Sequence, residues 1–508
     1  MSATSKAREP RAPTLLEAVI PVVALVVLIG TTIALFGTDA TGGPLQVALL
    51  VSAVVAGLIA FKNGYTSAEV RDAAVGGVSS GMSALFILLA VGSLIGTWNM
   101  AGTIPTVVYY GVGLLSATWF YPATALVCGL VGLAIGSSWT TAATLGVAFV
   151  ALAPLVGANP AIAAGAVISG AYFGDKMTPV SETTVLVPTM VGKVTTQEHI
   201  GAMIWTSGPA VAIALGLFTI IGLMTPASGP GFDPAVAQAA LAAEFNITLL
   251  NLLPMALLVF FSIRRFPPFL AIFSCALFAG VLAPFTQPEA VAAFVARPEL
   301  GPLSTGIHAI FAAMATGFVS SSGNETIDAL FSRGGMASML NTIWLVLAAL
   351  TFAAIMEHAG FLERLIRPVI ARAKSTGRLI ASVVATCIGL NVIAGDQYVA
   401  IVMPSRVYRL EFARRGIAPR MLSRAVEDSG TVTSPLVPWN SCGAYMAGVL
   451  GVATGAYLPY CFFNLLSPLI SLIYGFTGFR IEHVPPSETP DDGSGVVTDT
   501  VSLEGGVA

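Results

Sequence analysis

The amino-acid sequence predicts an all-α polytopic membrane protein with two inverted-topology repeats, broken helices and re-entrant hairpins. Three observations predict this fold class. The composition is too apolar for a water-soluble chain, two segments in different halves of the chain match each other, and polar residues interrupt the apolar runs at matched places.

The composition places the chain in a membrane. Of its 508 residues, 56% are hydrophobic and only 10% are charged, whereas a soluble globular chain is about one quarter charged. Apolar runs of about 17–25 residues recur, which is the length that a helix needs to cross about 30 Å of hydrocarbon. Barrel strands would give short alternating segments instead. The expected membrane segments are 14–37, 44–61, 77–97, 121–152, 161–190, 203–225, 247–263, 267–285, 303–320, 337–357, 379–405, 425–452 and 457–477.

The order of domains follows from these runs. Lys6, Arg8 and Arg11 precede a first apolar run that is too long for a cleaved signal peptide, so we expect it to remain as a span. His199 is expected in a loop, and the five scattered cysteines are expected to be packing residues. The divisions are a cytoplasmic N-terminal tail (1–13), transmembrane repeat 1 (14–225), an external loop (226–246), transmembrane repeat 2 (247–477) and a disordered cytoplasmic C-terminal tail (478–508).

Two long segments indicate an internal duplication. The stretch GGVSSGMSALFILLAVGSLIGTWNMAG (76–102) aligns without a gap with GGMASMLNTIWLVLAALTFAAIMEHAG (334–360). A near-equal offset persists further along the chain. A shift of 259 places Gly136 on Gly395 and Ser137 on Asp396, and a shift of 256 places GDKMTP (174–179) on GTVTSP (430–435). Three near-equal offsets predict one duplicated unit.

Charged residues predict that the two repeats have opposite orientations. The segment 98–120 carries no charge, whereas its counterpart 360–378 carries five Lys or Arg residues. Six arginines follow between 406 and 424, where the matching loop near 153–160 has none. Because cytoplasmic loops collect Lys and Arg, matching loops lie on opposite sides of the membrane. Counting sides along the chain then requires that 303–320 does not cross fully.

Four polar breaks fall at matched places in the apolar runs. They are GSSWTT (136–141), GDKMTPVSETT (174–184), NVIAGDQY (391–398) and EDSGTVTSPLVPWNS (427–441). The first and third lie within 121–152 and 379–405, which are predicted to be re-entrant hairpins. Unwound backbone at membrane depth needs protein or water to satisfy it. Freed carbonyls, hydroxyls and carboxylates are hard oxygen ligands that suit a small cation such as sodium.

The candidate ion- and proton-binding residues lie in these breaks. A single break can be explained equally well by a kink in a membrane helix as by an ion site. An ionisable residue in a span, however, costs about 2.5–3.5 kcal/mol. We therefore expect some of the five carboxylates in the breaks to carry ions. Asp175 and Asp396 rank first, then Glu427 and Asp428, with Glu182 as the fifth. Groups expected to complete a sodium site at the same cluster are Ser137, Ser138, Thr140, Thr178, Ser181, Thr183, Asn391, Ser429, Thr433, Ser434 and Asn440. Lys176 is expected to neutralise a carboxylate across the repeat interface.

Membrane enzymes and passive channels are the competing classes. An intramembrane serine protease built on GSSW would need a histidine in a span, for which only His308 is suitable. An aspartyl protease built on AGDQY would need glycine where Ile393 stands, and no HExxH occurs. Inverted repeats with broken helices favour alternating access over a channel. We therefore expect a secondary transporter, neither an enzyme nor a nucleic-acid-binding protein, with no cofactor.

The motifs of the breaks resemble those of the bacterial sodium/proton antiporter family called NhaC. The matching stretches are SSWTTAATLGVAF (137–149), GAYFGDKMTPVSETT (170–184), SRGGMASML (332–340), GDQYVAIVMPSR (395–406) and LSRAVEDSGTVTSPLVPWNSCGAYMAG (422–448). They cover both repeats in order. Thr140 stands where the family commonly has glycine, and Glu182 where it commonly has aspartate, so the ion and its coupling ratio stay open.

This resemblance implies exchange of external protons for internal sodium in a bacterial inner membrane. It also leaves an alternative, because the family contains antiporters of malate and lactate. Competition of sodium and protons for one carboxylate site is enough to couple the two fluxes. The sequence leaves open which carboxylate titrates. Membrane lipid is the expected surrounding, both termini are expected in the cytoplasm, and the oligomeric state, a homodimer included, is undetermined.

Overall fold

The computed structural model describes residues 10–114, 117–224, 234–264, 266–321, 323, 327–328 and 331–484. Nine helices among these residues are long and apolar enough to cross a membrane. Two further pairs of helices meet the same criterion if each pair is taken as one span, and the helices within these pairs are bent by 90° and 89° relative to each other. The predicted class, an all-α polytopic membrane protein with broken helices, is confirmed.

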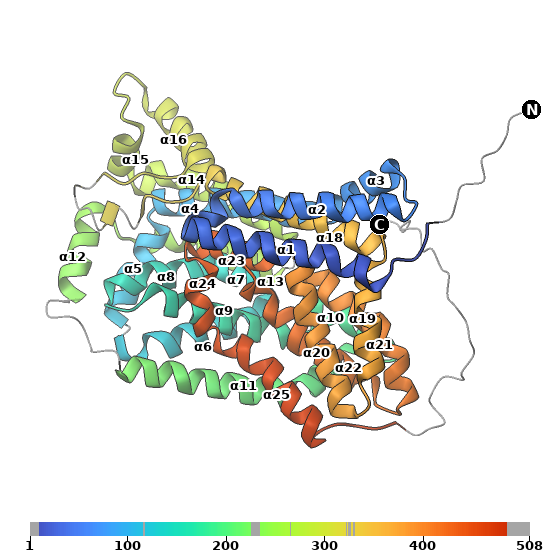
Figure 1. Ribbon diagram of the computed structural model, residues 1–508. Coiled ribbons are helices and arrows are strands. Elements are labelled where there is room, and N and C mark those ends of the chain that lie inside the picture. Colours follow the sequence, from blue (N-terminus) through green and yellow to red (C-terminus); the bar gives the residue numbers. More distant parts are fainter. Residues whose placement is uncertain are drawn as a thin grey trace, which may run out of the picture.

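The first half of the chain runs from blue to green in Figure 1. Its helices are α1 (Leu15–Phe36), α2 (Pro44–Lys62), α3 (Ser67–Ser80), α4 (Met82–Met100), α5 (Thr103–Leu114), α6 (Ala117–Ile135), α7 (Ser138–Thr141), α8 (Val147–Leu155), α9 (Pro160–Lys176), α10 (Glu182–Val191) and α11 (Thr196–Met224). A π-helical turn, Ala142–Gly146, joins α7 to α8. Capping boxes at Thr14 and Thr66 begin α1 and α3, because each threonine exchanges hydrogen bonds with a glutamate three residues later.

The second half contains the remaining helices. They are α12 (Pro234–Glu244), α13 (Leu253–Ile263), α14 (Pro268–Thr286), α15 (Pro288–Val295), α16 (Pro302–Thr316), α18 (Leu340–His358), α19 (Phe361–Arg372), α20 (Thr376–Ile393), α21 (Gln397–Arg414), α22 (Pro419–Val426), α23 (Ser441–Leu450), α24 (Thr454–Tyr457) and α25 (Phe462–Thr477). A π-helical segment, Glu427–Thr431, follows α22. The 15 residues of α16 rise only about 22 Å, which is short of the hydrocarbon thickness.

Two segments that were expected to be a loop and a tail contain ordered structure. Helix α12 occupies most of the described part of the loop expected at 226–246. Residues 478–484 of the expected C-terminal tail pack on the protein, with an isolated bridge between Ile417 and His483. The rest of that tail, and residues 1–9, lie outside the described residues.

The matched segments 76–102 and 334–360 run antiparallel where they meet: α3 packs on α18, and α4 packs on the 3₁₀ turn Met336–Met339 just before α18. Gly77 in α3 is so close to α18 that a Cβ on it would lie 2.4 Å from the Cβ of Ala354. Further along, Gly335 N donates to Gly92 O at 2.6 Å. Rising numbers in the first copy thus meet falling numbers in the second. This is the relation that inverted repeats require.

Both ends of the bundle are recognisable in Figure 1. The beginning of α1 lies at the same end as α19, α21 and α22, and α12, α15 and α16 lie at the opposite end. Contacts support the first grouping. Lys62 Nζ at the end of α2 is 3.1 Å from Glu17 Oε1 in α1, and Tyr65 OH donates to His358 O at the end of α18 at 3.3 Å. The arginine-rich loops and the start of α1 therefore share one end.

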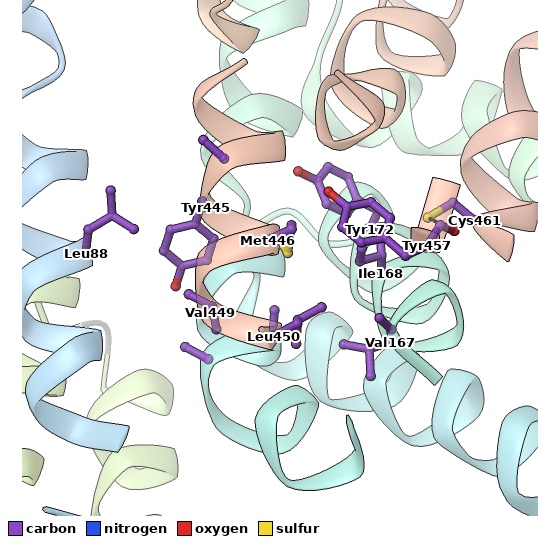
Figure 2. Close-up of a cluster of buried hydrophobic side chains, with 14 of the residues drawn as sticks. Leu88, Val167, Ile168, Tyr172, Tyr445, Met446, Val449, Leu450, Tyr457 and Cys461 are labelled. Carbon is purple, nitrogen blue, oxygen red and sulfur yellow. Dashed lines mark hydrogen bonds between the residues drawn. The ribbon is translucent and has the colours of Figure 1, made fainter. Parts of the chain in front are cut away.

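A hydrophobic core joins the two halves behind the breaks. Figure 2 shows Tyr445 and Met446 of α23 between Leu88 of α4 and the α9 side chains Ile168 and Tyr172. All five are buried. The broken helices α9 and α22–α23 are thus held in one packed layer, which fixes where their polar breaks lie.

Candidate functional site

The two segments that were predicted to be re-entrant hairpins, 121–152 and 379–405, have the same backbone geometry at their tips. Gly136 and Gly395 both have positive φ, +73° and +62°, a conformation that glycine adopts without penalty. Each is followed by an N-cap residue. Ser137 Oγ accepts from Thr140 N at 3.2 Å, and Asp396 Oδ1 accepts from Tyr398 N at 2.8 Å. The sequence match of Ser137 with Asp396 is therefore a match of structural position.

The breaks that follow repeat this correspondence. Ser181 precedes α10, and Asn440 precedes α23, with its Oδ1 accepting from Cys442 N at 3.0 Å. Each tip glycine lies against the break of its own half. A Cβ on Gly136 would be 2.9 Å from Val180 Cβ, and Gly395 O accepts from Ser441 N at 2.8 Å.

These pairs share one offset of 259, so the shift of 256 expected for the second pair of breaks is wrong. That shift aligned Pro179 with Pro435, whereas the helix starts align Pro179 with Pro438. The cause is the different course of the chain before each break. In the first half a straight α9 ends at Lys176, and in the second half α22 passes into a π-helical segment.

A cavity of about 650 Å³ lies where tips and breaks meet, with walls from both halves of the chain. Its carboxylates are Asp175, Glu182 and Asp396. The other predicted site residues that line it are Ser137, Ser138, Thr140, Ser181 and Thr183. Among the described residues of its wall, none is Lys, Arg or His. The cavity is therefore acidic.

Asp175 and Asp396 are held by similar groups. Asp175 Oδ2 accepts from Ser138 N at the first hairpin tip at 3.0 Å. Asp396 Oδ1 also accepts from Val399 N at 3.1 Å, and its Oδ2 lies 3.4 Å from Ser441 Oγ. Each carboxylate thus meets main-chain donors and still borders the cavity. Close packing of α9 on α6 places Asp175 there, because a Cβ on Gly174 would lie only 2.3 Å from Gly129 O.

Several lining residues were not predicted as site residues. Tyr398 OH donates to Glu182 Oε2 at 2.7 Å and so connects α21 with α10. Gln397 Oε1 accepts from Ser434 Oγ at 2.9 Å. Ser441 and Cys442 begin α23 and also line the cavity. Their position beside the tip and break motifs is the signal that could have identified them.

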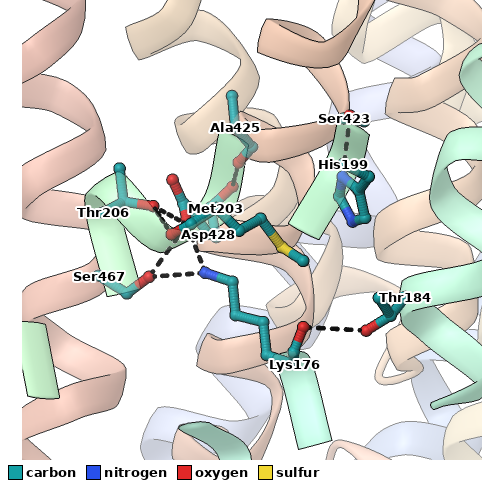
Figure 3. A network of polar contacts seen from close by, with 10 residues as sticks. Lys176, Thr184, His199, Met203, Thr206, Ser423, Ala425, Asp428 and Ser467 are labelled. Atoms are coloured by element: carbon teal, nitrogen blue, oxygen red, sulfur yellow. Dashed lines mark hydrogen bonds and ion pairs between the residues drawn. The ribbon is translucent and has the colours of Figure 1, made fainter. Parts of the chain in front are cut away.

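Lys176 and Asp428 form a separate buried group, shown in Figure 3. Their side chains are fully buried and form an ion pair between α9 and the π-helical segment of the second half. Thr206 Oγ1 donates to Asp428 Oδ1 at 2.9 Å, and Lys176 Nζ donates to Ser467 Oγ at 3.1 Å. Thr206 and Ser467 were missed from the sequence, since isolated hydroxyls in apolar spans carry no pattern.

Glu427 is buried beside this pair but does not share its contacts. Both of its carboxylate oxygens lack a hydrogen-bond partner among the described residues, and it is fully buried. It does not line the acidic cavity.

His199, expected in a loop, is instead buried in the first turn of α11, with Nδ1 2.9 Å from Ser423 Oγ. The capping pair Thr195–Glu198 starts that helix earlier than the apolar run indicated.

Three of the remaining predicted residues, Asn391, Thr433 and Asn440, hold the second hairpin against its break. Asn391 Nδ2 donates to Gly430 O at 2.6 Å and to Thr433 Oγ1 at 3.0 Å, and Asn440 Nδ2 donates to Asn391 Oδ1 at 3.1 Å. Ser429 Oγ bonds within its own turn to Ala425 O at 2.6 Å. Thr178 Oγ1 accepts from Val180 N at 3.4 Å. Asn391, Thr178, Ser429, Thr433, Ser434 and Asn440 are not part of the cavity wall.

The five carboxylates therefore do not form the single cluster that the sequence suggested. Three border the cavity, Asp428 pairs with Lys176, and Glu427 is buried without a hydrogen-bond partner among the described residues. In the described part of the chain, no three His, Cys, Asp or Glu side chains converge as a metal site would require. Of the two residues that the serine-protease alternative needs, Ser138 lines the cavity, and His308 lies on α16 and is not among the lining residues.

Broken helices around a cavity with carboxylates in its wall, between two matched halves, define a class, the membrane transporters. Comparison with known proteins gives the family. The profile of the Na+/H+ antiporter family matches residues 4–193 and 170–479. The chain belongs to this family.

Three curated relatives illustrate its range. The Na(+)/H(+) antiporter NhaC of Alkalihalophilus pseudofirmus is 37% identical over 86% of this chain and 90% of its own length. The malate-2H(+)/Na(+)-lactate antiporter of Bacillus subtilis is 32% identical over 93% and 96%. The arginine/ornithine antiporter ArcD of Halobacterium salinarum is 32% identical over 94% and 95%.

Proposed function

We propose that this chain exchanges sodium for protons by alternating access across a bacterial inner membrane, at a site formed by Asp175 and Asp396. One observation carries the proposal: the cavity between the two halves is lined by three carboxylates and, among its described residues, by no basic side chain. Such a wall attracts small cations and protons. Family membership supports the same reaction.

The coupling follows from competition. A protonated carboxylate is a poor cation ligand, so sodium binding requires proton loss and proton binding expels sodium. Asp175 and Asp396 each face one hairpin tip and one break, with Ser138 and Ser441 as neighbours. If only the occupied forms interconvert between the two sides, sodium and protons must travel in opposite directions.

Asp428 is a weaker choice for the exchanged group. Its charge is already balanced by Lys176, and removing one partner of a buried pair leaves an uncompensated charge. We assign this pair to stabilising the contact between the halves. Glu427 is buried and its carboxylate oxygens have no hydrogen-bond partner among the described residues. Burying an unpaired charge is costly, so we place Glu427 outside the sodium site.

Everted vesicles with a preset pH gradient test the assignment. Sodium added to vesicles with the unaltered chain is expected to collapse the gradient, and Asp175→Asn or Asp396→Asn to reduce the rate at least 100-fold. Glu289→Gln removes an exposed carboxylate on α15 and serves as the control with an unchanged rate. Normal exchange in both aspartate variants, with folding verified by gel filtration, would refute the assignment.

The pH dependence gives a second measurement. If one proton competes with sodium, lowering the pH below the pKa of the shared carboxylate raises the apparent KM for sodium about tenfold per pH unit. The maximal rate at saturating sodium is expected to change less. A KM that is independent of pH would exclude competition at a common group.

An organic cation is a second candidate substrate, favoured by the size of the cavity. Its volume of about 650 Å³ lies within the range of about 300–1,000 Å³ that small-molecule sites occupy. A relative is described as an arginine/ornithine antiporter. Malate or lactate would need a positive partner, which the described wall lacks, and the nearby main-chain donors are used by Asp175 and Asp396. Running the vesicle assay with arginine, ornithine, malate and lactate separates these cases.

The orientation of the chain in the membrane is part of the same proposal. The start of α1 and the arginine-rich ends of α19 and α21 share one end of the bundle, and the positive-inside rule assigns that end to the cytoplasm. Single cysteines introduced at Arg364 and at Glu289, in a chain freed of its own cysteines, are expected to label from opposite sides. Labelling of both from one side would contradict this orientation.

A further inference from the structure

A second cavity, of about 900 Å³, lies at the end of the bundle that carries the arginine-rich loops. It is bordered by the residues after α10, by the C-terminal part of α21, by the loop before α22 and by the segment 482–484. Its basic side chains are Lys193, Arg409, Arg420 and His483, and its acidic ones are Glu198 and Glu482. The acidic exchange cavity shares none of these residues.

The charges of this second cavity are unevenly paired. Arg420 forms an ion pair with Glu482. Glu198 accepts from Thr195 N and from Thr195 Oγ1, both at 2.8 Å, as a helix cap. Lys193 and Arg409 have no hydrogen-bond or ion-pair partner in the part of the chain that the structure describes. Neither of these two side chains is therefore neutralised by a direct ion pair, and the three Lys or Arg against two Glu leave the cavity with a formal charge of +1.

The two unpaired cations border the same cavity. Arg409 Nη1 is 3.9 Å from the position that a Cβ on Gly192 would occupy, and Lys193 is the next residue, so the backbone that carries Lys193 passes beside the guanidinium. Both side chains are exposed. A guanidinium and an ammonium in one cavity suit a phosphate, which accepts charge-assisted hydrogen bonds from several donors at once.

An apolar wall accompanies the cations. Leu410, next to Arg409 in the chain, is 55% exposed, whereas Val191, Phe412 and Leu422, which also border the cavity, are buried. A free inorganic phosphate would leave Leu410 uncovered. A ligand with a phosphate and an attached hydrocarbon chain would cover both parts.

We propose that this cavity binds an anionic phospholipid, with its phosphate on Lys193 and Arg409 and its hydrocarbon against Leu410. Basic pockets between membrane helices on the cytoplasmic side are suited to such headgroups. The positive-inside rule assigns this end of the bundle to the cytoplasmic leaflet. The proposal stands independently of which ions the chain exchanges.

The lipid site is mechanically connected to the exchange cavity. Helix α10 begins at Glu182 beside the exchange cavity and ends just before Lys193, and α21 begins beside Asp396 and carries Arg409. The two helices pack together, and Tyr398–Glu182 joins them at the cavity end. The lipid would join them at the other end, about 15–18 Å along the helices. Its occupancy is therefore expected to alter the exchange rate.

Binding to the purified full-length chain in a zwitterionic detergent tests the proposal. Dioleoyl phosphatidylglycerol, dioleoyl phosphatidylcholine and inorganic phosphate are titrated separately, and bound ligand is counted by native mass spectrometry. Each charge near an anionic lipid contributes about 1 kcal/mol, so Lys193→Gln with Arg409→Gln is expected to weaken phosphatidylglycerol binding about 30-fold. Arg364→Gln with Lys374→Gln removes two exposed charges near the same end, outside the cavity, and is expected to change binding less than about threefold.

The outcomes separate the alternatives. Equal binding of phosphatidylglycerol to both double variants would overturn the proposal, as would equal binding of phosphatidylcholine and phosphatidylglycerol to the unaltered chain. Tight binding of inorganic phosphate that depends on Lys193 and Arg409 would make the cavity a free-anion site and overturn the lipid assignment. If the double variant does not fold, Lys193→Gln alone is expected to weaken lipid binding about fivefold.

Discussion

Asp175 and Lys176 are neighbours in the chain but belong to different regions of the molecule. Asp175 borders a cavity between the halves and accepts from Ser138 N at a hairpin tip. Lys176 is fully buried and pairs with Asp428. Successive residues on a helix point about 100° apart, so the last turn of α9 directs one side chain to the cavity and the next to the core.

This difference separates two uses of buried charge. A carboxylate at the cavity, held by main-chain donors, can change its proton or cation without leaving another charge unpaired. A carboxylate in the Lys176–Asp428 pair cannot, because its loss leaves the fully buried Lys176 uncompensated. The first region is suited to exchange and the second to holding the halves together. Four predictions would break or sharpen this contrast.

Lys176→Met is expected to have the largest effect on stability. It leaves Asp428 buried without its partner and should lower the free energy of unfolding by about 3–5 kcal/mol. Unfolding of the purified protein in mixed micelles, followed by circular dichroism, measures the change. Lys176→Met combined with Asp428→Leu removes both charges and is expected to recover most of the loss. A single variant as stable as the unaltered chain would mean that the pair does not hold the halves together.

Gly395→Ala is expected to act on the hairpin tip of the cavity region. Its φ of +62° disfavours an L side chain, and a Cβ would lie 3.1 Å from Ala349 Cβ, so the cost is about 1–3 kcal/mol together with slower exchange. Gly389→Ala in the middle of α20, where nothing lies within 4 Å, is the matched control and is expected to be neutral or slightly stabilising. Equal effects of the two variants would show that the tip geometry is unimportant.

Ser137→Ala and Asp396→Asn separate capping from charge at equivalent positions. Ser137→Ala removes an N-cap and is expected to cost about 0.5–2 kcal/mol while sodium–proton competition persists. Asparagine caps as well as aspartate, so Asp396→Asn is expected to change stability by less than about 0.5 kcal/mol while exchange is lost. Unfolding and vesicle assays on both variants test this; exchange lost in Ser137→Ala at full stability would assign ion binding to the serine as well.

Tyr398→Phe is expected to have the smallest effect. It removes one hydrogen bond to Glu182 at a partly exposed place and should cost less than about 1 kcal/mol. The KM for sodium is expected to change less than about threefold, measured in the vesicle assay. A much larger change in KM would show that Glu182 takes part in the exchange site directly.

The sequence was informative where a property depends on neighbouring residues. Hydropathy located the spans, because only a helix satisfies its own backbone in hydrocarbon. Glycine and proline marked the breaks around Gly136 and Gly395, and the matched segments 76–102 and 334–360 predicted the antiparallel relation of the two copies. The N-caps at Ser137 and Asp396 follow from the same local pattern.

The tertiary structure decided which polar groups meet. Lys176 finds Asp428 252 residues away, and the buried His199 meets Ser423, because helices from both halves pack there. The division of five carboxylates between a cavity and a core also depends on the direction in which each break leaves its helix. The sequence by itself determined a duplicated membrane transporter with polar breaks. Only the packing of one half against the other determined which breaks form the cavity, since that choice depends on contacts between residues far apart in the chain.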